Sequence, residues 1–500
     1  MVIERGEKNH KFVKFFAWGA FLSFLLILLC CITPLVKEAG YFLLLILVLF
    51  ILGVLLWKVI KKAKTSVCVV CFFVLLVIWS FLVFQLGIAL EQLPAWDFGR
   101  VQRGAWELVK NGYFVSSSTI EYFLESPNNF FPAVYLFRWL AMLTAWGVKP
   151  EDAVLILNTL SLSLTILFVF LTFMKIKRPQ QGLLTSIYCF LFAPMFLYAS
   201  IYYTDTLSMV YVSVILYLSS FLLSKDTKLF IQILCGSLLG LVAAIGYLLK
   251  GTPIIAAVAA LICILLQDYR KFFISFATFL VCFFLVFGFW NEFSKDNNYL
   301  PKQQEANEGR LTASHYIMMG LNGRGGYSPA DHEFSTSIPT ISERKAENLR
   351  VIKERIKAYG FIGVLDHLKE KIKYTWGDGG YYAPQKIAIE PISDSPLLDY
   401  LSYDAKYYIY TSKILAASQL WLLLLIVLGA LGDVLNKETE VGIILLSRIA
   451  LVGLAVFLLI WETRSRYLVN YAPYLSILGA DTFRVLSDKF IRRTIKGKRH

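Results

Sequence analysis

The sequence predicts an all-α polytopic membrane protein, and three observations carry that prediction. First, the 500 residues are 57% hydrophobic and only 17% charged, whereas soluble proteins are roughly 45–50% apolar and about 25% charged. Second, apolar runs of about 20 residues, the length that crosses a bilayer as a helix, recur along the chain. Third, Lys and Arg gather in short clusters at the ends of those runs, as they do in cytoplasmic loops.

Twelve apolar runs are candidate membrane spans. In chain order they are residues 12–34, 41–57, 67–90, 152–175, 181–200, 206–224, 229–249, 253–268, 271–290, 413–434, 441–461 and 467–484. The basic clusters between them lie at residues 58–64, 175–178, 225–228, 270–271 and 492–499. Twelve crossings with both termini in the cytoplasm place every cluster on the cytoplasmic side.

A further apolar run, residues 129–146, is interpreted as a re-entrant or juxtamembrane helix on the outer face. It carries Arg138 in its middle and Pro132 near its start. Counting it as a span would also move the 175–178 cluster to the outside. Irregular backbone at membrane depth is acceptable where protein or a wet cavity covers it.

Five regions follow from this topology. Two extra N-terminal spans (1–66) precede a membrane core (67–290) whose first outer loop is 91–151. An extracytoplasmic cap domain (291–412), C-terminal spans (413–485) and a basic cytoplasmic tail (486–500) complete the chain. Leu349, Ile352, Ile356 and Tyr359 recur at three- and four-residue steps, so we expect a mainly helical cap.

The charge pattern argues against nucleic-acid binding, although the formal net charge is +14. The segment 291–412 is nearly neutral, with 15 basic and 16 acidic residues, so the excess lies in the dispersed clusters. All eight cysteines lie in apolar runs and give neither a disulfide framework nor zinc-ligand spacing. The lack of an Asn-x-Ser/Thr sequon favours a bacterial plasma membrane protein.

Two acids at the outer ends of spans are candidate catalytic residues. Asp97 follows the third span and Asp205 precedes the sixth. An acid where a span meets water is costly and often functional, and a carboxylate can serve as a general base. The alternative for both is a helix N-cap, since aspartate is among the preferred capping residues.

Cations at the same membrane face are candidate ligands of a donor phosphate. Lys250 ends an apolar run, and Arg464 and Arg466 follow Glu462 at the outer end of another. Arginine forks match phosphate geometry. The alternatives are a snorkelling lysine and a structural salt bridge from Glu462 to either arginine.

Asn128, Asn129 and His315 are candidate substrate-binding residues on the outer side. The asparagines follow Pro127 and could simply form a turn. His315 lies in the cap segment, where a packed loop histidine is an equal alternative.

The order of these signals resembles the GT-C superfamily of glycosyltransferases that use polyprenyl-phosphate sugars. The matching stretches are Trp96-Asp97-Phe98, Pro127-Asn128-Asn129, Tyr203-Thr204-Asp205-Thr206 and Glu462-Thr463-Arg464-Ser465-Arg466-Tyr467, with a long outer loop before the last. Protein O-mannosyltransferases and lipid A aminoarabinose transferases share this layout. The Pro-Asn-Asn and Tyr-Thr-Asp-Thr variants are similar to Gram-positive members that glycosylate cell-wall polysaccharides or teichoic acids.

The resemblance implies an inverting transferase that moves a sugar from a polyprenyl-phosphate (undecaprenyl-type) donor to such an extracytoplasmic acceptor. It implies catalytic roles for Asp97 and Asp205, phosphate binding by Lys250, Arg464 and Arg466, and substrate binding by Asn128, Asn129, Tyr203, His315 and Glu462. The two extra N-terminal spans depart from the family layout. Because the first loop has no second acid beside Asp97, we expect no metal and no other cofactor.

Two other functions remain open. A transporter or flippase of lipid-linked sugars would place its charges near the midplane of repeated halves, whereas these acids lie at one face and the chain shows no internal repeat. An O-antigen polymerase or ligase-like enzyme would use loop arginines, for which Arg310 and Arg324 are candidates.

Overall fold

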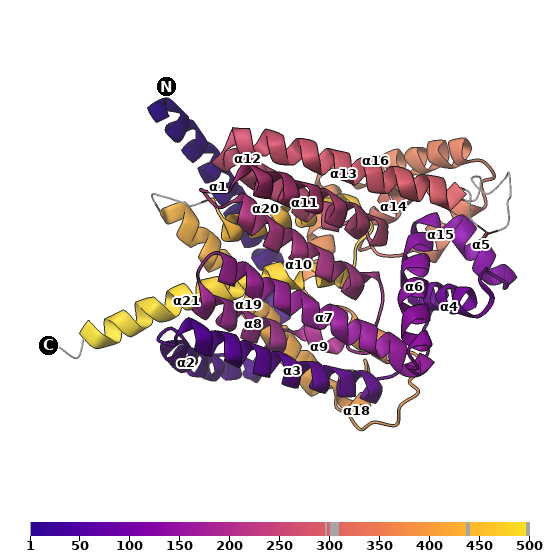
Figure 1. Ribbon diagram of the computed structural model, residues 1–500. Helices are drawn as coiled ribbons and strands as arrows, with labels where there is room; N and C mark the ends of the chain where they lie inside the picture. The colour runs from indigo at the N-terminus through magenta and orange to yellow at the C-terminus, as the bar shows by residue number, and fades with distance from the viewer. Residues whose placement is uncertain (1, 296–297, 301–309, 437–440, 497–500) are drawn as a thin grey trace.

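The protein is a bundle of long helices with shorter helices gathered at one end (Figure 1). A computed structural model describes residues 2–295, 298–300, 310–436 and 441–496, with side chains placed for residues 11–491 within those ranges. In this part of the chain, one β-bridge pairs Gln92 with Pro391, and the remaining regular structure is helical. The predicted all-α fold is therefore confirmed.

The helices, in chain order, are α1 (Val2–Ala39), η1 (Gly40–Phe42), α2 (Leu43–Ile60), α3 (Thr65–Ala89), α4 (Trp96–Asn111), α5 (Ser117–Glu125), η2 (Pro127–Asn129), α6 (Phe130–Ala145), α7 (Pro150–Lys175), α8 (Pro179–Leu191), α9 (Ala193–Leu197), α10 (Thr204–Leu222), α11 (Leu229–Leu249), α12 (Pro253–Gln267), α13 (Tyr269–Lys295), α14 (Ala313–Gly320), α15 (Pro329–Thr336), α16 (Ile341–Trp376), α17 (Ala383–Ile387), α18 (Leu398–Leu401), α19 (Tyr408–Leu435), α20 (Ile443–Ile460), η3 (Ser465–Tyr471) and α21 (Ala472–Lys496).

Two ends of the bundle can be distinguished in Figure 1. Helix α1 begins and α21 ends at the same end, which we call the terminal end. Helices α4, α5, α6, α14 and α15 gather at the opposite end, which we call the cap end. Helix α6, predicted as a re-entrant or juxtamembrane helix, runs across the direction of α7 and α10 there.

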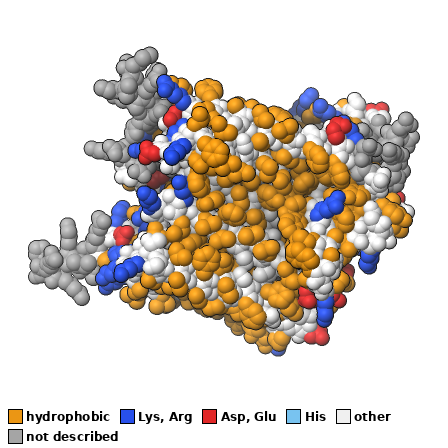
Figure 2. Space-filling view, viewed as in Figure 1, with side chains coloured by type: hydrophobic (Ala, Val, Ile, Leu, Met, Phe, Trp, Pro, Cys, Tyr) orange, Lys and Arg blue, Asp and Glu red, His pale blue; other side chains and the backbone are white. Residues whose placement is uncertain are grey.

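The protein is an integral membrane protein by the length and composition of its helices. Among the described residues, eight segments are long and apolar enough to span a bilayer: 11–60, 65–89, 150–175, 204–222, 229–249, 269–295, 408–435 and 443–460. Figure 2 shows a broad hydrophobic band across the middle of the molecule, with Lys and Arg gathered at the terminal end. The predicted twelve crossings and their orientation stay predictions.

The predicted span 181–200 is interrupted in the structure. It consists of α8 and α9, separated at Phe192, whose extended backbone precedes Pro194 in the first turn of α9. Proline lacks the amide hydrogen that a continuous helix needs, so the chain restarts there.

A second hydrophobic core holds the segment 91–151 against the long helices of the bundle. It joins Phe98 and Leu108 of α4 to Phe123 of α5, Phe130 of α6 and Leu207 of α10. Helices α4 and α5 pack closely at Gly104. A methyl group added at this position would lie only 2.6 Å from the Phe123 ring, so the close approach requires glycine. This packing fixes the positions of α4 and α5 relative to the start of α10.

The cap region consists of short helices and the long α16. Gly360 has φ +59 and divides α16 into two helical parts; a left-handed backbone of this kind favours glycine. Backbone amides of Glu462 and Thr463 donate to the carbonyls of Tyr316 and Gly325, which ties the cap to the segment after α20. The predicted tail 486–500 is helical to Lys496, and residues 497–500 lie outside the described residues, as do the side chains from 492 onward.

Candidate active site

Asp97 is held by a chain of hydrogen bonds that joins three loops. The Tyr122 hydroxyl of α5 donates to Asp97 Oδ1 at 3.1 Å, and Asn129 Nδ2 donates to Tyr122 Oη at 2.5 Å. Tyr203 Oη donates in turn to Asn129 Oδ1 at 3.3 Å. Burial raises the pKa of Tyr122, so its hydroxyl stays protonated and remains a donor.

Asp97 is not the cap of its helix. The N-cap of α4 is Ala95, and no side chain caps that end. Asp97 lies in the first turn, where the helix dipole favours a negative charge. No described Lys or Arg forms an ion pair with Asp97. The carboxylate is thus oriented by a neutral hydroxyl and has no direct ion-pair partner among the described residues.

Asp205 has a different environment from Asp97. It lies in the first turn of α10 with a side chain only 1% exposed, and its Oδ1 forms an ion pair with Nζ of Lys250. Its Oδ2 is buried and has no hydrogen-bond partner among the described residues. Because an unpaired buried charge costs about 3–5 kcal/mol, each member of this pair holds the other in place.

Two further cations lie around Tyr203. Lys386 of α17 is buried, with Nζ 5.2 Å from the centre of the Phe98 ring and 5.6 Å from that of Tyr203. The guanidinium of Arg466 lies 5.9 Å from the Tyr203 ring centre. Burial, and then the nearby charge of Arg466, lower the pKa of Lys386 to about 7.

Arg466 and Lys250 share a second aromatic ring. They lie 5.1 Å and 5.1 Å from the centre of the Tyr467 ring. The Tyr467 hydroxyl donates to Glu462 Oε1 at 3.2 Å, and burial raises the pKa of Glu462. Three cations, Lys250, Lys386 and Arg466, therefore surround a region in which Asp205 is the one acid that pairs with any of them in the described structure.

Arg464 points to a neighbouring aromatic wall. Its Nε donates to the Tyr374 hydroxyl at 2.8 Å, and its guanidinium lies 3.9 Å from the Tyr382 ring centre. The predicted alternative, a salt bridge from Glu462 to Arg464 or Arg466, is not formed by the described side chains. The two arginines thus have separate neighbours.

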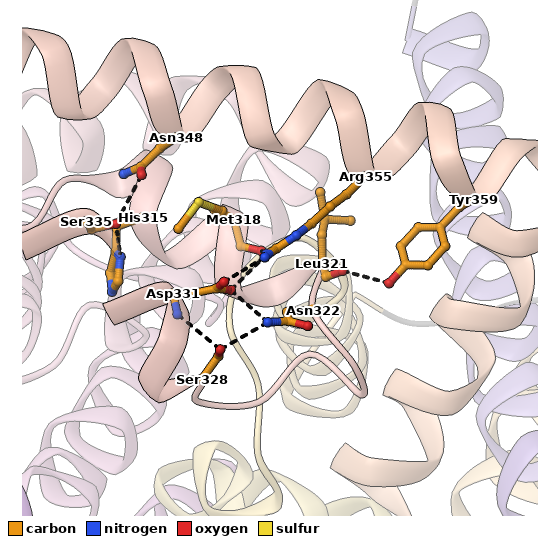
Figure 3. Close-up of polar contacts among 10 residues, drawn as sticks. All are labelled: His315, Met318, Leu321, Asn322, Ser328, Asp331, Ser335, Asn348, Arg355 and Tyr359. Carbon is orange, nitrogen blue, oxygen red and sulfur yellow. Dashed lines mark hydrogen bonds and ion pairs between the residues drawn. The ribbon is translucent and has the colours of Figure 1, made fainter. Parts of the chain in front are cut away.

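The last two predicted residues lie apart from this cluster. Asn128 is exposed in η2. His315 is fully buried in the cap, where Figure 3 shows it pointing toward Ser335 and Asn348. The Ser335 hydroxyl donates to Asn348 Oδ1 at 3.0 Å, so it accepts the proton on His315 Nδ1 at 2.7 Å. Burial lowers the pKa of His315 to about 4, which leaves a neutral ring packed in the cap.

The interior of the cap is held by an ion pair that Figure 3 also shows. Both terminal nitrogens of Arg355 donate to Asp331, at 2.8 and 2.6 Å. Asn322 donates to the same carboxylate at 3.1 Å and to Ser328 Oγ at 3.0 Å. These contacts hold the turn that contains Gly325, whose carbonyl accepts from the Thr463 amide. They therefore position the cap against the segment after α20.

Tyr122 and Lys386 were not predicted from the sequence. Each is an unremarkable residue of a short loop helix, and its importance depends on side chains far away in the chain. The hydrophobic neighbours of Lys386 in the sequence, Ile387 and Ile389, gave the one hint that this lysine is buried.

In the part of the chain that the structure describes, no three His, Cys, Asp or Glu side chains are grouped so as to hold a metal ion. The expected independence from metal stays a prediction.

Comparisons with known proteins give a family but no close relative. A family model described as "Conserved hypothetical integral membrane protein" matches residues 31–485. Among solved structures, the chain is similar to ArnT from Cupriavidus metallidurans bound to undecaprenyl phosphate, with 14% sequence identity and a TM-score of 0.36. That match covers 84% of this chain and 78% of the other. No curated protein matches significantly.

Proposed function

We propose that this chain, which belongs to the conserved hypothetical integral membrane protein family, is an inverting glycosyltransferase of the GT-C type. The donor is a polyprenyl-phosphate sugar, and the acceptor is an extracytoplasmic hydroxyl, such as one on a cell-wall polysaccharide or teichoic acid. The site then faces the outside of the membrane, and the basic terminal end faces the cytoplasm.

The observation that carries this proposal is a carboxylate without an ion-pair partner that is connected by hydrogen bonds to a cluster of cations. Asp97 accepts a hydrogen bond from Tyr122 but forms no ion pair among the described residues. The chain through Asn129 connects it to Tyr203, whose ring lies beside Lys386 and Arg466. This arrangement supports the assignment of a base and of phosphate-binding cations to one site.

The reaction uses both halves of this arrangement. The acceptor oxygen attacks the anomeric carbon, and Asp97 takes the hydroxyl proton as the new bond forms. The bond from the anomeric carbon to the phosphate oxygen breaks, and its electron pair leaves with the polyprenyl phosphate. Attack opposite the leaving group inverts the anomeric carbon. The phosphate gains one negative charge in this step.

Lys386, Arg466 and Lys250 supply the cations that this developing charge requires. Fixed charges in a site shielded from water stabilise a transition state more strongly than the same charges in water. Asp205 acts as a positioning residue, because its ion pair with Lys250 fixes that ammonium group. Tyr122 is likewise a positioning residue, because its hydrogen bond orients the Asp97 carboxylate.

The substitution Asp97→Asn tests the proposal. Asparagine keeps the size and the hydrogen bond from Tyr122 but cannot take a proton, and general-base catalysis is worth roughly 100- to 10,000-fold. We expect the purified variant to bind the lipid-linked donor with parental affinity. Its rate of sugar transfer should fall at least about 100-fold. The measurement is transfer rate at saturating donor.

Asp394→Asn is the matched control, since Asp394 is an exposed cap-region acid that contacts no candidate site residue. This control should keep the parental rate. Near-parental transfer by Asp97→Asn would remove the proposed base and the mechanism with it.

A further inference from the structure

The terminal end contains a cavity that the proposed reaction does not use. Its volume is about 650 Å³, and it lies where the ends of α7, α10 and α19 meet the starts of α8 and α20 and the side of α21. These helix ends lie opposite the cap end in Figure 1. Binding pockets for small ligands are commonly about 300–1,000 Å³, so the space suits a headgroup-sized molecule.

The cavity has an excess of positive charge. Lys175, Lys177, Arg178 and Arg484 line it against two acids, Asp433 and Asp481. Both acids are already engaged: Asp433 forms an ion pair with Arg448, and Asp481 accepts from Arg484 and Gln181 at 2.8 Å each.

Arg484 is paired with Asp481, and Arg178 has a contact of its own, so Lys175 and Lys177 are the cations available to a ligand. Neither forms an ion pair in the described part of the chain, and Lys175 contacts the face of the Phe221 ring at 4.4 Å. Lys177 has φ +59, a left-handed conformation in which glycine is usual at a helix end. A lysine at this position gives the turn a charge that glycine would not.

The remaining walls suit an amphiphilic molecule. Phe173, Leu223 and Ile444 give apolar surface between the helices. The first turn of α20 also lines the cavity, and its N-cap, Gly442, offers no side chain to the free amides. An apolar wall beside lysines at the cytoplasmic end of membrane helices is the arrangement that holds phosphate headgroups of anionic lipids.

We propose that this cavity binds a phosphate group at the terminal end of the bundle, supplied by the headgroup of an anionic phospholipid, with Lys175 and Lys177 as its ligands. The site is independent of the proposed glycosyl transfer. A free phosphate ester has the same chemistry but would leave the apolar walls unused.

Isothermal titration of the purified full-length protein tests this site. The probes are dihexanoyl phosphatidylglycerol, dihexanoyl phosphatidylcholine and glycerol 3-phosphate. We expect the anionic lipid to bind, and the choline lipid and the glycerol phosphate to bind far more weakly. The double variant Lys175→Gln/Lys177→Gln should lose roughly 10- to 30-fold in affinity, given the usual contribution of each lysine near an anionic headgroup.

The control is Lys225→Gln/Lys228→Gln, which removes two exposed lysines from the same end that do not line the cavity. It should keep parental affinity. Equal losses in both double variants would show a general surface-charge effect and overturn the site, as would unchanged binding by Lys175→Gln/Lys177→Gln or equal binding of the choline lipid. Equal binding of glycerol 3-phosphate would overturn the lipid as the source. If the double variant fails to fold, Lys175→Gln is compared with Lys225→Gln instead.

Discussion

At the scale of single residues, Lys386 shows how burial changes the charge of a lysine side chain. Its ammonium lies against two aromatic rings, and no described carboxylate neutralises it within ion-pair distance. Burial lowers its pKa from 10.5 to about 7, so the free protein carries this charge only below that pH. A bound phosphate would favour the charged form and restore the proton.

This environment predicts the pH dependence of donor use. The cation is present below pH 7 and lost above it, so kcat/KM for the lipid-phosphate donor should fall as pH rises from about 6 to about 8.5. One charge-assisted contact is worth about 1.5–3 kcal/mol, so the fall should reach tenfold or more. Steady-state kinetics across this range measure it.

Lys386→Arg provides the control for that profile, since arginine stays charged throughout. Its kcat/KM should be flat over the same interval. A fall of equal size in Lys386→Arg would assign the titration to another group.

Substitutions of Arg464 and Arg466 should differ in their effect on KM for the donor. Arg466 lies beside Tyr203 and Tyr467, whereas Arg464 is bound to Tyr374 and Tyr382. We expect Arg466→Ala to raise KM for the donor about 10- to 150-fold, from the loss of one charge-assisted contact. Arg464→Ala should change it less. Titrating the donor against each variant measures the two KM values. Equal increases would contradict separate roles for the two arginines.

At the scale of elements, an ion pair connects α5 to α15 of the cap. His332 Nε2 of α15 lies 2.6 Å from Glu125 Oε1 at the end of α5, the helix that also carries Tyr122. The hydrogen bond between them raises the pKa of His332 and lowers that of Glu125. The free energy of the contact between α5 and α15 therefore depends on pH.

The sign follows from the two shifts. Stabilisation from His332 is complete below the unfolded value of 6.5 and disappears as pH rises through the raised folded pKa. Stabilisation from Glu125 is complete above 4.5 and disappears as pH falls through the lowered folded pKa. The pair is therefore strongest between about pH 4.5 and 6.5.

Hydrogen exchange of α5 should show this dependence. Because both partners are a third exposed, the pair is worth about 0.5–1 kcal/mol. Amides of α5 should exchange two- to fivefold more slowly at pH 6 than at pH 8.5, after correction for intrinsic rates. His332→Gln should abolish the difference, and a difference that survives in this variant would rule out the pair as its cause.

The elements were more predictable from the sequence than the site. Long apolar runs gave the span helices, and the apolar pattern from Leu349 to Tyr359 lies in α16. The interruption at Phe192 was not foreseen, because hydropathy alone does not distinguish a continuous helix from two short ones. The predicted topology placed Asp97, Asn129 and Tyr203 on the same side of the membrane. Their hydrogen-bond chain through Tyr122 is consistent with that prediction.

What the sequence could not give is pairing between distant residues. Asp97 and Asp205 look alike as isolated acids, yet one accepts from a tyrosine and the other is paired with Lys250. That difference depends on how α5 and α11 approach α4 and α10. Lys386 was missed for the same reason, since its surroundings are formed by α4 and the segment before α10.

At the scale of the whole molecule, the two ends of the bundle should face different compartments. Asp394 is exposed in the segment after α17, and Lys62 is exposed in the turn after α2. With the cap end outside, Asp394→Cys should react with a membrane-impermeant maleimide in intact cells. Lys62→Cys should react only after permeabilisation. The parent protein is the blank for its native cysteines, and the opposite pattern would invert the topology.

The order in which the chain is made has a consequence for when the site exists. Asp97 and Asp205 enter the membrane early in synthesis, whereas Glu462 and Arg466 follow only after α20. Lys250 can reach Asp205 long before Arg466 arrives beside Tyr203. On the proposed mechanism, a nascent chain therefore inserts most of its helices before one of the three phosphate-binding cations, Arg466, has been made. Helix α21 follows directly on the segment that contains Arg466, so on the proposed mechanism a premature stop within α20 should give a membrane-resident product that lacks this cation and transfers sugar poorly.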